Sequence, residues 1–242
     1  MKIKPFLLLS TIVLLVIVLI PAHPGGRAAE HTYWVNSAED IGDNTLRWAI
    51  NQANTHVGSG DILTIEFDML ETDPNFNDST GVWTITVDSA LPALIASNTI
   101  IDGYSQEGAE YGTSSRSPML LIEINGENLV VDPPLYGNSG FNILSSGNTI
   151  TGLMINNFPV NGISIAGTSA ANNTIAGNCI GTDYQCAHPV ANGGDGVFIG
   201  LGAKNNLVGG ILLRGKISFY TMDWMGLGST AAVPMAILSA GI

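Results

Sequence analysis

The sequence Asn148-Thr149-Ile150-Thr151-Gly152 decides the fold, because three other segments of the chain repeat its pattern. Those segments are Asn98-Thr99-Ile100-Ile101-Asp102-Gly103, Asn173-Thr174-Ile175-Ala176-Gly177 and Asn206-Leu207-Val208-Gly209-Gly210. From Asn148 the pattern returns at Asn173 and, after a longer interval, at Asn206. Repetition at intervals of roughly 20–50 residues is typical of solenoid proteins, in which each repeat forms one supersecondary unit.

A second segment recurs in step with the first. Gly162-Ile163-Ser164-Ile165 matches Gly196-Val197-Phe198-Ile199, and an Asn-Asn pair follows each of them. Such short strands cannot each bury an apolar face alone, whereas coils stacked about 4.8 Å apart share one continuous core. The pattern therefore predicts an all-β fold, a right-handed parallel β-helix (solenoid), with its coils at residues 98–210.

Asparagine at equivalent turns has a physical role in such a stack. It tolerates the left-handed backbone conformation, and its side-chain amide can hydrogen-bond to the Asn of the next coil. Residues 138–206 contain 12 Asn in 69 positions. We therefore expect an asparagine ladder with Asn148, Asn173 and Asn206 as structural residues. The longer repeats predict a loop at residues 182–193 that protrudes from the stack.

The region before the coils, residues 30–97, is predicted to be an N-terminal cap with its first strands. Residues 31–36 (HTYWVN), 62–67 (ILTIEF) and 82–87 (VWTITV) have the β-branched and aromatic composition of strands. A short capping α-helix is expected to begin after Asp43 or Asn44 and to run through Asn54. Its apolar residues recur at i, i+3, i+4 and i+7, namely Leu46, Ala49, Ile50 and Ala53.

Residues 1–29 have the features of a secretory signal peptide. Two lysines precede an uninterrupted apolar run, residues 6–20, and small residues follow. The run is shorter than the roughly 20 apolar residues of a membrane-spanning helix. Cleavage after Ala28 would place Gly26 and Ala28 where small residues are required; an uncleaved anchor is the alternative. Both predict a secreted or cell-surface, extracytoplasmic location, and cleavage would leave no membrane span.

The charge of the chain disfavours several classes of partner. Three of the eight Lys and Arg residues lie in the leader, which leaves 5 against 20 Asp and Glu, a net charge of −15. Nucleic acid is not an expected partner, because phosphate binding depends on clustered Lys and Arg. Anionic membranes and polyanionic substrates are disfavoured for the same reason. The sequence leaves the oligomeric state open.

The chain has two cysteines, Cys179 and Cys186. In an exported protein they are expected to form a small-loop disulfide. The alternative is a buried Cys179 and a free Cys186 thiol, because spacing alone does not establish bridging geometry. With two cysteines and no histidine pair at ligand spacing, the sequence predicts no metal site and no cofactor.

Residues 211–242 are interpreted as a degenerate, incomplete coil. They contain no Asn, but residues 224–242 shifted by 62 positions align with residues 162–180, with Ile237 and Ile242 on Ile175 and Ile180. A hydrophobic C-terminal anchor is the competing interpretation, although glycines and a proline interrupt the uncharged run. The expectation is a truncated copy whose last coil lacks a polar cap.

Residues 44–54 (NTLRWAINQAN) resemble the CSLREA segment of a group of exported bacterial β-helix proteins with a pectin-lyase-like fold. Asn44 stands where that family has Cys, and Trp48 where Glu is usual. The matching residues are Leu46, Arg47, Ala49, Ile50, Ala53 and Asn54, with further similarity at Leu91-Pro92, residues 101–106 (IDGYSQ) and residues 177–183 (GNCIGTD). The resemblance covers about residues 33–210. It implies that the helix caps the coil stack and that the protein is secreted or on the cell surface, and it brings no agreed catalytic residues.

Polysaccharide lyases and glycoside hydrolases also use the parallel β-helix, so both are alternative functions. A lyase needs a base in suitable company, but Arg116 and Lys204 are the only basic residues of the coils. A hydrolase needs carboxylates about 5–9.5 Å apart. The candidates are Asp102, Asp183 and Asp195, whose turn contexts favour structural roles.

The remaining candidates have equally ordinary explanations. His56 and His188 lie in expected loops without a nucleophile beside them, and residues 71–78 (ETDPNFND) lack the spacing of a calcium loop. No residue is therefore assigned a catalytic role. The preferred function is a non-catalytic module for adhesion or glycan binding, whose partner is an extracellular polysaccharide or cell-surface glycan, with Tyr184 and Phe198 as stacking aromatics. A non-functional truncated fragment is a third interpretation.

Overall fold

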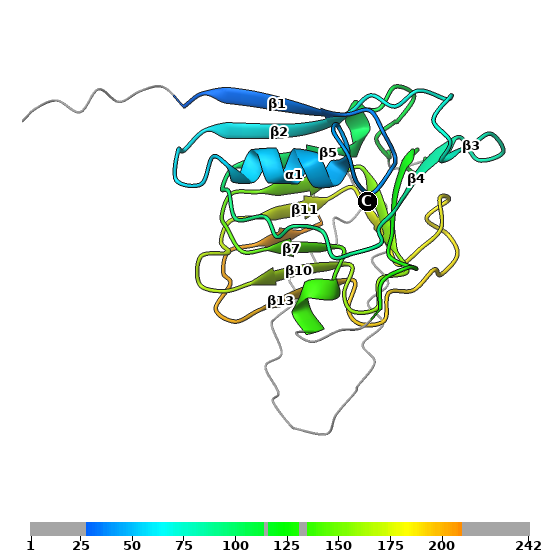
Figure 1. The fold of residues 1–242 in the computed structure, drawn as a ribbon. Helices are drawn as coiled ribbons and strands as arrows, with labels where there is room; N and C mark the ends of the chain where they lie inside the picture. Colours follow the sequence, from blue (N-terminus) through cyan, green and yellow to red (C-terminus); the bar gives the residue numbers. More distant parts are fainter. Residues whose placement is uncertain (1–27, 114–115, 131–134, 210–242) are drawn as a thin grey trace, which may run out of the picture.

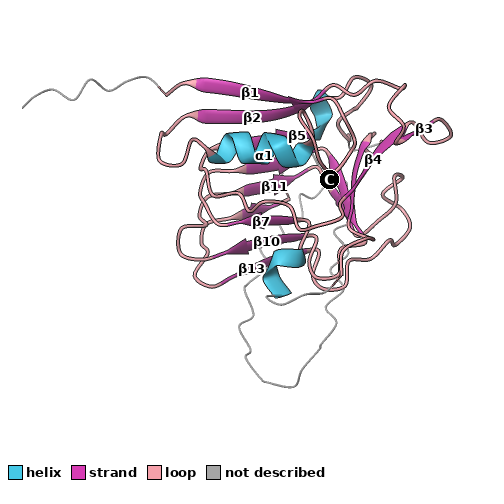
Figure 2. Ribbon diagram, viewed as in Figure 1, coloured by secondary structure: helices cyan, strands magenta, loops and turns pink. Residues whose placement is uncertain are grey.

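The computed structural model describes residues 28–113, 116–130 and 135–209, in which short parallel strands predominate (Figures 1 and 2). Helices are few, and α1 lies near the N-terminal end (Figure 1). The elements in chain order are β1 (Glu30–Val35), α1 (Leu46–Asn54), β2 (Ile62–Phe67), β3 (Phe76–Asn77), β4 (Val82–Thr86), β5 (Thr99–Asp102), the 3-10 helix η1 (Gly103–Ser105), β6 (Ile122–Asn125), the 3-10 helix η2 (Leu135–Asn138), β7 (Phe141–Ile143), β8 (Thr149–Thr151), β9 (Leu153–Asn156), β10 (Ile163–Ala166), β11 (Thr174–Ala176), β12 (Cys179–Ile180), β13 (Val197–Gly200) and β14 (Leu207–Val208).

The strands form three sheets. Sheet 1 has the order β1-β2-β5-β8-β11-β14, sheet 2 the order β12-β9-β6-β4-β3, and sheet 3 the order β13-β10-β7. From β7 onward the chain visits sheets 3, 1 and 2 in turn, so β7, β8 and β9 form one coil and β10, β11 and β12 the next. The parallel pairing of Thr149 with Thr174, and of Thr174 with Leu207, reproduces the two successive repeats that begin at Asn148 and Asn173 in the sequence.

Apolar side chains of successive coils stack into one core between the sheets. In sheet 1, Ile65, Ile101, Ile150 and Ile175 occupy paired positions, and each is at most 2% exposed. Because strand residues alternate between the two faces, one isoleucine per strand is enough to extend this column by one coil. Full burial of such a side chain contributes about 1.5–3 kcal/mol. The repeated Thr-Ile pattern of the sequence is therefore the origin of the core.

We expected one asparagine per turn to adopt the left-handed conformation and also to bond in the ladder. In the turn that leads into sheet 1, two consecutive residues share these roles. The first residue has a left-handed backbone, with φ of +59° at Asn98 and +57° at Asn172. The second faces the ladder: the Thr99 amide donates to Asn148 Oδ1 over 3.0 Å. Asn148 is thus aligned with Thr99, and the sequence alignment of Asn98 with Asn148 is wrong by one residue. Asn98 occupies the left-handed position that Gly147 holds in the next coil, with φ of +72°.

Asn148, Asn173 and Asn206 form a ladder of side-chain amides across three coils. Asn148 Nδ2 donates to Asn173 Oδ1 over 2.9 Å, and Asn173 Nδ2 donates to Asn206 Oδ1 over 3.0 Å. The same two oxygens accept the backbone amides of Asn148 and Asn173, over 2.8 and 2.9 Å. Asn148 and Asn173 are fully buried, and buried amides of this kind need such partners.

Helix α1 packs on β1 and β2, and Figure 1 shows it above β7, β10 and β13. Its four predicted apolar residues are fully buried. The N-cap is Thr45, whose Oγ1 accepts the Trp48 amide over 3.3 Å, and the prediction of Asp43 or Asn44 as the cap is wrong. Thr45 has the extended backbone that an N-cap requires, whereas Asn44 has φ of +58°.

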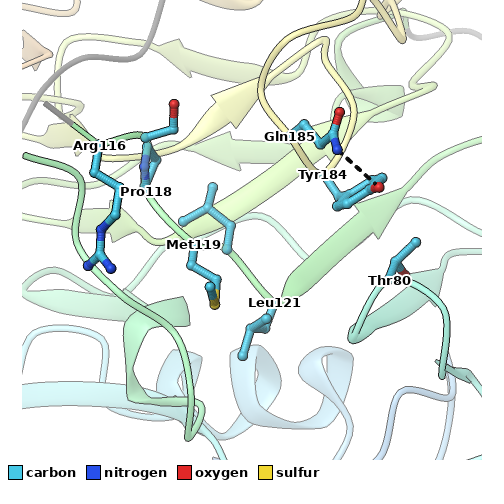
Figure 3. Close-up of a pocket in the computed structure, with 9 residues that line it drawn as sticks. Thr80, Arg116, Pro118, Met119, Leu121, Tyr184 and Gln185 are labelled. Atoms are coloured by element: carbon cyan, nitrogen blue, oxygen red, sulfur yellow. Dashed lines mark hydrogen bonds between the residues drawn. The ribbon is translucent and has the colours of Figure 1, made fainter.

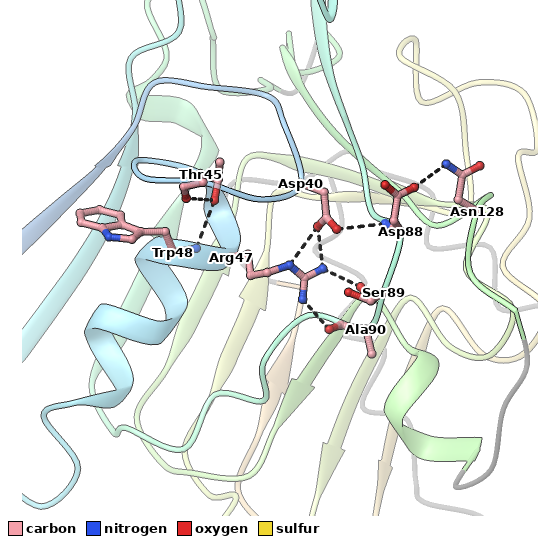
Figure 4. A network of polar contacts seen from close by, with 9 residues as sticks. Asp40, Thr45, Arg47, Trp48, Asp88, Ser89, Ala90 and Asn128 are labelled. Atoms are coloured by element: carbon pink, nitrogen blue, oxygen red, sulfur yellow. Dashed lines mark hydrogen bonds and ion pairs between the residues drawn. The ribbon is translucent and has the colours of Figure 1, made fainter.

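Arg47 connects α1 to the segment that leads into the coils (Figure 4). Its Nε and Nη2 donate to Asp40 Oδ1 over 3.1 and 2.6 Å, and its other bonds reach the carbonyl oxygens of Ser89 and Ala90, both over 2.7 Å. Asp40 is 7% exposed, and its Oδ2 accepts the Asp88 amide. The planar guanidinium thus bonds three acceptors on two chain segments at once, which a lysine ammonium would not do.

The three strands predicted before the coils are present in the structure. The strand expected at residues 62–67 is β2, and those expected at 31–36 and 82–87 are β1 and β4 within one residue. Over the described ranges, no helix has the length and apolar character to cross a membrane. The predicted leader, apart from residues 28 and 29, and the degenerate coil at 211–242 lie outside the described residues.

Candidate functional site

The loop at residues 182–193 is fastened to the strand before it by a disulfide. Cys179 and Cys186 are bonded, with their Cα atoms 5.5 Å apart, so the predicted disulfide is confirmed. Cys179 belongs to a small second core, which contains Val82, Tyr104, Leu120 and Met154 and is distinct from the main core. The disulfide therefore anchors the loop to strand β12 at one end and holds its next residues close to the protein surface.

Asp183 organises the interior of this loop. Its Oδ1 accepts the amides of Gln185, Ala187 and His188 over 3.2, 3.0 and 3.2 Å, and its Oδ2 lies 2.7 Å from His188 Nδ1. Burial acts to raise the pKa of Asp183, but the hydrogen bonds from Ala187 and His188 outweigh it and lower the pKa below the usual value. The carboxylate is occupied by its own loop, which is a structural role.

A groove lies beside this loop, with a volume of about 410 Å³. Small-molecule sites commonly measure about 300–1,000 Å³. Figure 3 shows Tyr184 and Thr80 on one side of it and Arg116 and Met119 on the other, with Leu121 between them. Three separate segments of the chain thus meet here. The lining residues are Thr80, Arg116, Ser117, Pro118, Met119, Leu120, Leu121, Tyr184 and Gln185.

The groove combines an exposed aromatic ring with apolar side chains and hydrogen-bond donors. Tyr184 is 42% exposed, and its hydroxyl accepts a hydrogen bond from Gln185 Nε2 over 3.2 Å. Met119 is 50% exposed, and Arg116 forms an ion pair with Glu110. None of the nine lining residues carries a carboxyl or imidazole group. The lining can therefore stack on and hydrogen-bond a ligand, but it supplies no obvious acid or base.

The aspartates Asp102 and Asp195, which were considered for catalysis, lie outside the groove. Asp102 Oδ1 accepts the Tyr104 amide over 2.9 Å and caps η1, and burial raises the pKa of Asp102 despite this bond. Tyr104 lies beside it, and burial, with Tyr111 and Asp102 adding, raises the pKa of Tyr104 to about 12. Asp195 precedes β13, where its amide donates to Asn161 Oδ1 over 2.9 Å. Neither Asp102 nor Asp195 lines the groove.

The remaining residues singled out in the sequence also lie elsewhere. Lys204 is exposed and pairs through its backbone with Ala171. Phe198 stands on β13 opposite Ser164 and does not line the groove, so Tyr184 is the only one of the two proposed aromatics that does. In the acidic loop, Asp73 accepts the Ala38 and Asn75 amides over 3.0 and 2.8 Å.

One cluster of polar side chains was missed by the sequence analysis. His31 and His56 are distant in the chain, yet their ring centroids are 4.2 Å apart, and both lie near Asp61. Among the described residues these are the only group of three or more His, Cys, Asp and Glu residues whose ligand atoms all lie within 4.8 Å of one another. The sequence predicted no metal site because no histidines have ligand spacing along the chain. The pairing of β1 with β2 nevertheless brings His31 close to Asp61.

The sequence held a signal for this cluster. Residues 56–61 (HVGSGD) place a histidine and an aspartate at the two ends of a turn, with left-handed glycines of φ +81° and +78° at Gly58 and Gly60. The strand expected at residues 62–67 begins directly after Asp61, and its pairing with the strand that contains His31 brings the three side chains together. Because a fold does not itself confer a function, function has to be inferred from the residues of these sites. No family model, curated protein or solved structure matches this chain.

Proposed function

We propose that this chain is an exported, right-handed parallel β-helix module of the CSLREA-containing, pectin-lyase-like type, which binds a neutral glycan without cleaving it. Three parallel sheets visited in turn, with an asparagine ladder at one turn, support the β-helix. The disulfide of the 182–193 loop supports an oxidising, extracytoplasmic location. Export also follows from the leader predicted at residues 1–29.

The observation that carries the binding function is the composition of the groove. Tyr184 offers a ring on which the C–H face of a sugar can stack, and Thr80, Arg116 and Gln185 offer hydrogen bonds to hydroxyl groups. Met119 and Leu121 add apolar surface beside the ring. A lining with no carboxyl or imidazole group favours recognition over hydrolysis, which needs two positioned carboxylates.

Charge selects among possible glycans. The chain without its leader carries 20 Asp and Glu against 5 Lys and Arg, so long-range repulsion acts on polyuronates. Arg116, the cation in the groove, is already paired with Glu110. We therefore assign the site to neutral polysaccharides such as glucans, mannans or xylans.

The loop that carries Tyr184 is ordered before any ligand arrives. The disulfide and the four contacts of Asp183 fix the residues on both sides of Tyr184. Binding to a preorganised ring avoids part of the entropy cost of ordering a loop. This rigidity is the second reason for assigning Tyr184 to ligand contact.

The test is affinity electrophoresis of the secreted protein in gels that contain neutral polysaccharides or polygalacturonate, beside an assay for new reducing or unsaturated ends with calcium present. We expect retardation by a neutral polysaccharide, no turnover, and a loss of affinity of about tenfold or more in Tyr184→Ala, which corresponds to about 1.4 kcal/mol. Trp34→Ala is the matched control, because Trp34 is 48% exposed on β1 and does not line the groove.

Two results would contradict this function. Turnover that is abolished by Asp183→Ala or Asp195→Ala would make the protein a polysaccharide lyase or glycoside hydrolase. Retention that is equal in Tyr184→Ala and in the native chain would remove the groove from glycan binding, even if the protein binds glycan at another surface.

A further inference from the structure

The three side chains His31, His56 and Asp61 converge from three different segments at the N-terminal cap. His31 lies on β1, His56 follows α1, and Asp61 immediately precedes β2. His56 Nδ1 lies 3.0 Å from Asp61 Oδ2, and His31 Nε2 lies 3.5 Å from the same oxygen. All three side chains are partly accessible, so an ion and water can reach them.

These distances agree with a shared metal ion. Zinc binds imidazole nitrogen and carboxylate oxygen at about 2.0–2.2 Å, so neighbouring ligands of a tetrahedral site lie about 3.3 Å apart. Two of the three separations here, 3.0 and 3.5 Å, are close to that value, and the third is at most 4.8 Å. A small rotation of one imidazole is enough to bring this third separation, between the two histidines, to the same value.

The second oxygen of Asp61 is held independently of the histidines. Asp61 Oδ1 accepts a hydrogen bond from the Ala29 backbone nitrogen over 2.9 Å, a donor that cleavage after Ala28 would retain as an amine, and this leaves Oδ2 directed at both rings. A hydrogen bond of this kind orients a carboxylate ligand and contributes to metal affinity. The turn that carries His56 and Asp61 is closed as well, since the Ser59 amide donates to the His56 carbonyl and the Asp61 amide donates to Ser59 Oγ.

We infer that His31, His56 and Asp61 form a binding site for a divalent transition-metal ion of the zinc class, with water completing its coordination. Two imidazoles and one carboxylate suit zinc and its neighbours, whereas calcium and magnesium prefer sets of oxygen ligands. The ion would join the edge strand β1, the end of α1 and the start of β2. It would thereby fasten the cap at the end of sheet 1, where β1 is the edge strand among the described residues.

The test uses the secreted full chain, stripped with a chelator and titrated with zinc chloride by calorimetry. We expect one zinc ion per chain, a higher melting temperature in zinc, and no competition from calcium or magnesium. His31→Gln and His56→Gln should each weaken zinc binding by about tenfold or more. His188→Gln is the control and should bind as the native chain does, because His188 is 71% exposed and pairs only with Asp183.

Zinc is the appropriate probe for a specific reason. A mature chain that begins at Ala29 would carry a histidine in third place, and a free amine with such a histidine captures copper or nickel through backbone nitrogens without His56. Equal zinc affinity in the native chain and in folded His56→Gln would overturn the site. If either variant does not fold, cobalt binding to the native chain decides: strong visible bands of a four-coordinate ion support the site, and their absence overturns it.

Discussion

The repeating coils and the two segments that leave them are stabilised by different chemistry. Within the asparagine ladder of the coils the polar contacts are neutral: Asn148, Asn173 and Asn206 exchange amide hydrogen bonds beside columns of isoleucine. The N-terminal cap and the 182–193 loop instead use ionic and covalent contacts. These are Arg47 with Asp40, Asp183 with His188, the histidine cluster at Asp61, and the disulfide.

The difference follows from the presence or absence of an equivalent neighbour. A side chain in the ladder meets its own counterpart one coil away, at about 4.8 Å, so a charge there would face a like charge. A neutral amide has a donor and an acceptor and can bond to a copy of itself on both sides. Among the described residues, the ionic contacts of the cap and of the 182–193 loop do not recur from coil to coil, and opposite charges can therefore be paired there.

The largest effect is expected where the cap depends on a single guanidinium. Arg47→Ala leaves the Asp40 carboxylate, 7% exposed, without its cation and frees the carbonyls of Ser89 and Ala90. Breaking a buried pair from one side costs about 3–5 kcal/mol. Urea unfolding of the secreted protein measures this loss. Arg47→Lys should recover less than half of it, because an ammonium cannot reach all three acceptors; full recovery would show that charge alone matters here.

The ladder should respond to a change at its centre more than at its end. Asn173→Ala removes the amide that bonds Asn148, Asn206 and the Ser145 carbonyl, and leaves buried groups unsatisfied. The expected loss of unfolding free energy is about 2–3 kcal/mol. Asn206→Ala should cost less, since Asn206 bonds one ladder neighbour among the described residues and is only partly buried.

A control for the ladder lies one residue earlier. Asn172 has φ of +57°, a conformation that glycine adopts without strain, so Asn172→Gly should change the free energy of unfolding by less than about 0.5 kcal/mol. A loss in Asn172→Gly as large as that in Asn173→Ala would mean that the Asn172 side chain, which lies outside the ladder, contributes as much to the stack as the ladder does.

Much of this fold could be predicted because several repeats have the same arrangement of asparagine and isoleucine. Ile150 and Ile175 recur at one spacing with Asn before them, and any stacking that buries both residues also aligns the asparagines. The error of one residue at Asn98 arose because Asn serves both at the left-handed position and in the ladder. Only the φ of Asn98 and the bond from Thr99 to Asn148 separate the two roles.

The sites were harder to predict because they depend on contacts between dissimilar segments. Tyr184 was identified as a loop aromatic, but its meeting with Thr80 and Met119 depends on how three connections fold over sheet 2. His31 and His56 have no common spacing or motif. Their proximity comes from the parallel register of β1 with β2, in which His31 pairs with Leu63.

The disulfide should affect the loop and its groove more than the coils. Replacing Cys179 and Cys186 by serine opens a loop with a sequence separation of 7, for which chain entropy predicts a loss of about 2 kcal/mol. Glycan affinity should fall with it, because Tyr184 lies close to Cys186 in the chain. Urea unfolding and affinity electrophoresis of the double variant measure both effects. Unchanged binding with reduced stability would show that the hydrogen bonds of Asp183 alone position the ring.

The smallest effects concern two aspartates whose pKa values move in opposite directions, Asp102 in a coil and Asp183 in the loop. The pKa of Asp183 is lowered, so its charge stabilises the fold above the unfolded pKa of about 3.9 and this contribution is lost as the pH falls through the folded value. The pKa of Asp102 is raised by burial, so its charge costs stability above the folded value and none in acid below the unfolded one.

Replacing each aspartate by asparagine separates the two cases. Asp183→Asn should destabilise at pH 7 and approach the native chain in acid, whereas Asp102→Asn should be slightly more stable at pH 7, with a gain that also vanishes in acid. Unfolding by urea between pH 3 and pH 7 gives both curves. Asparagine can still accept the Tyr104 amide. A loss of unfolding free energy in Asp102→Asn would therefore mean that this coil benefits from a charge, in contrast to the neutral ladder.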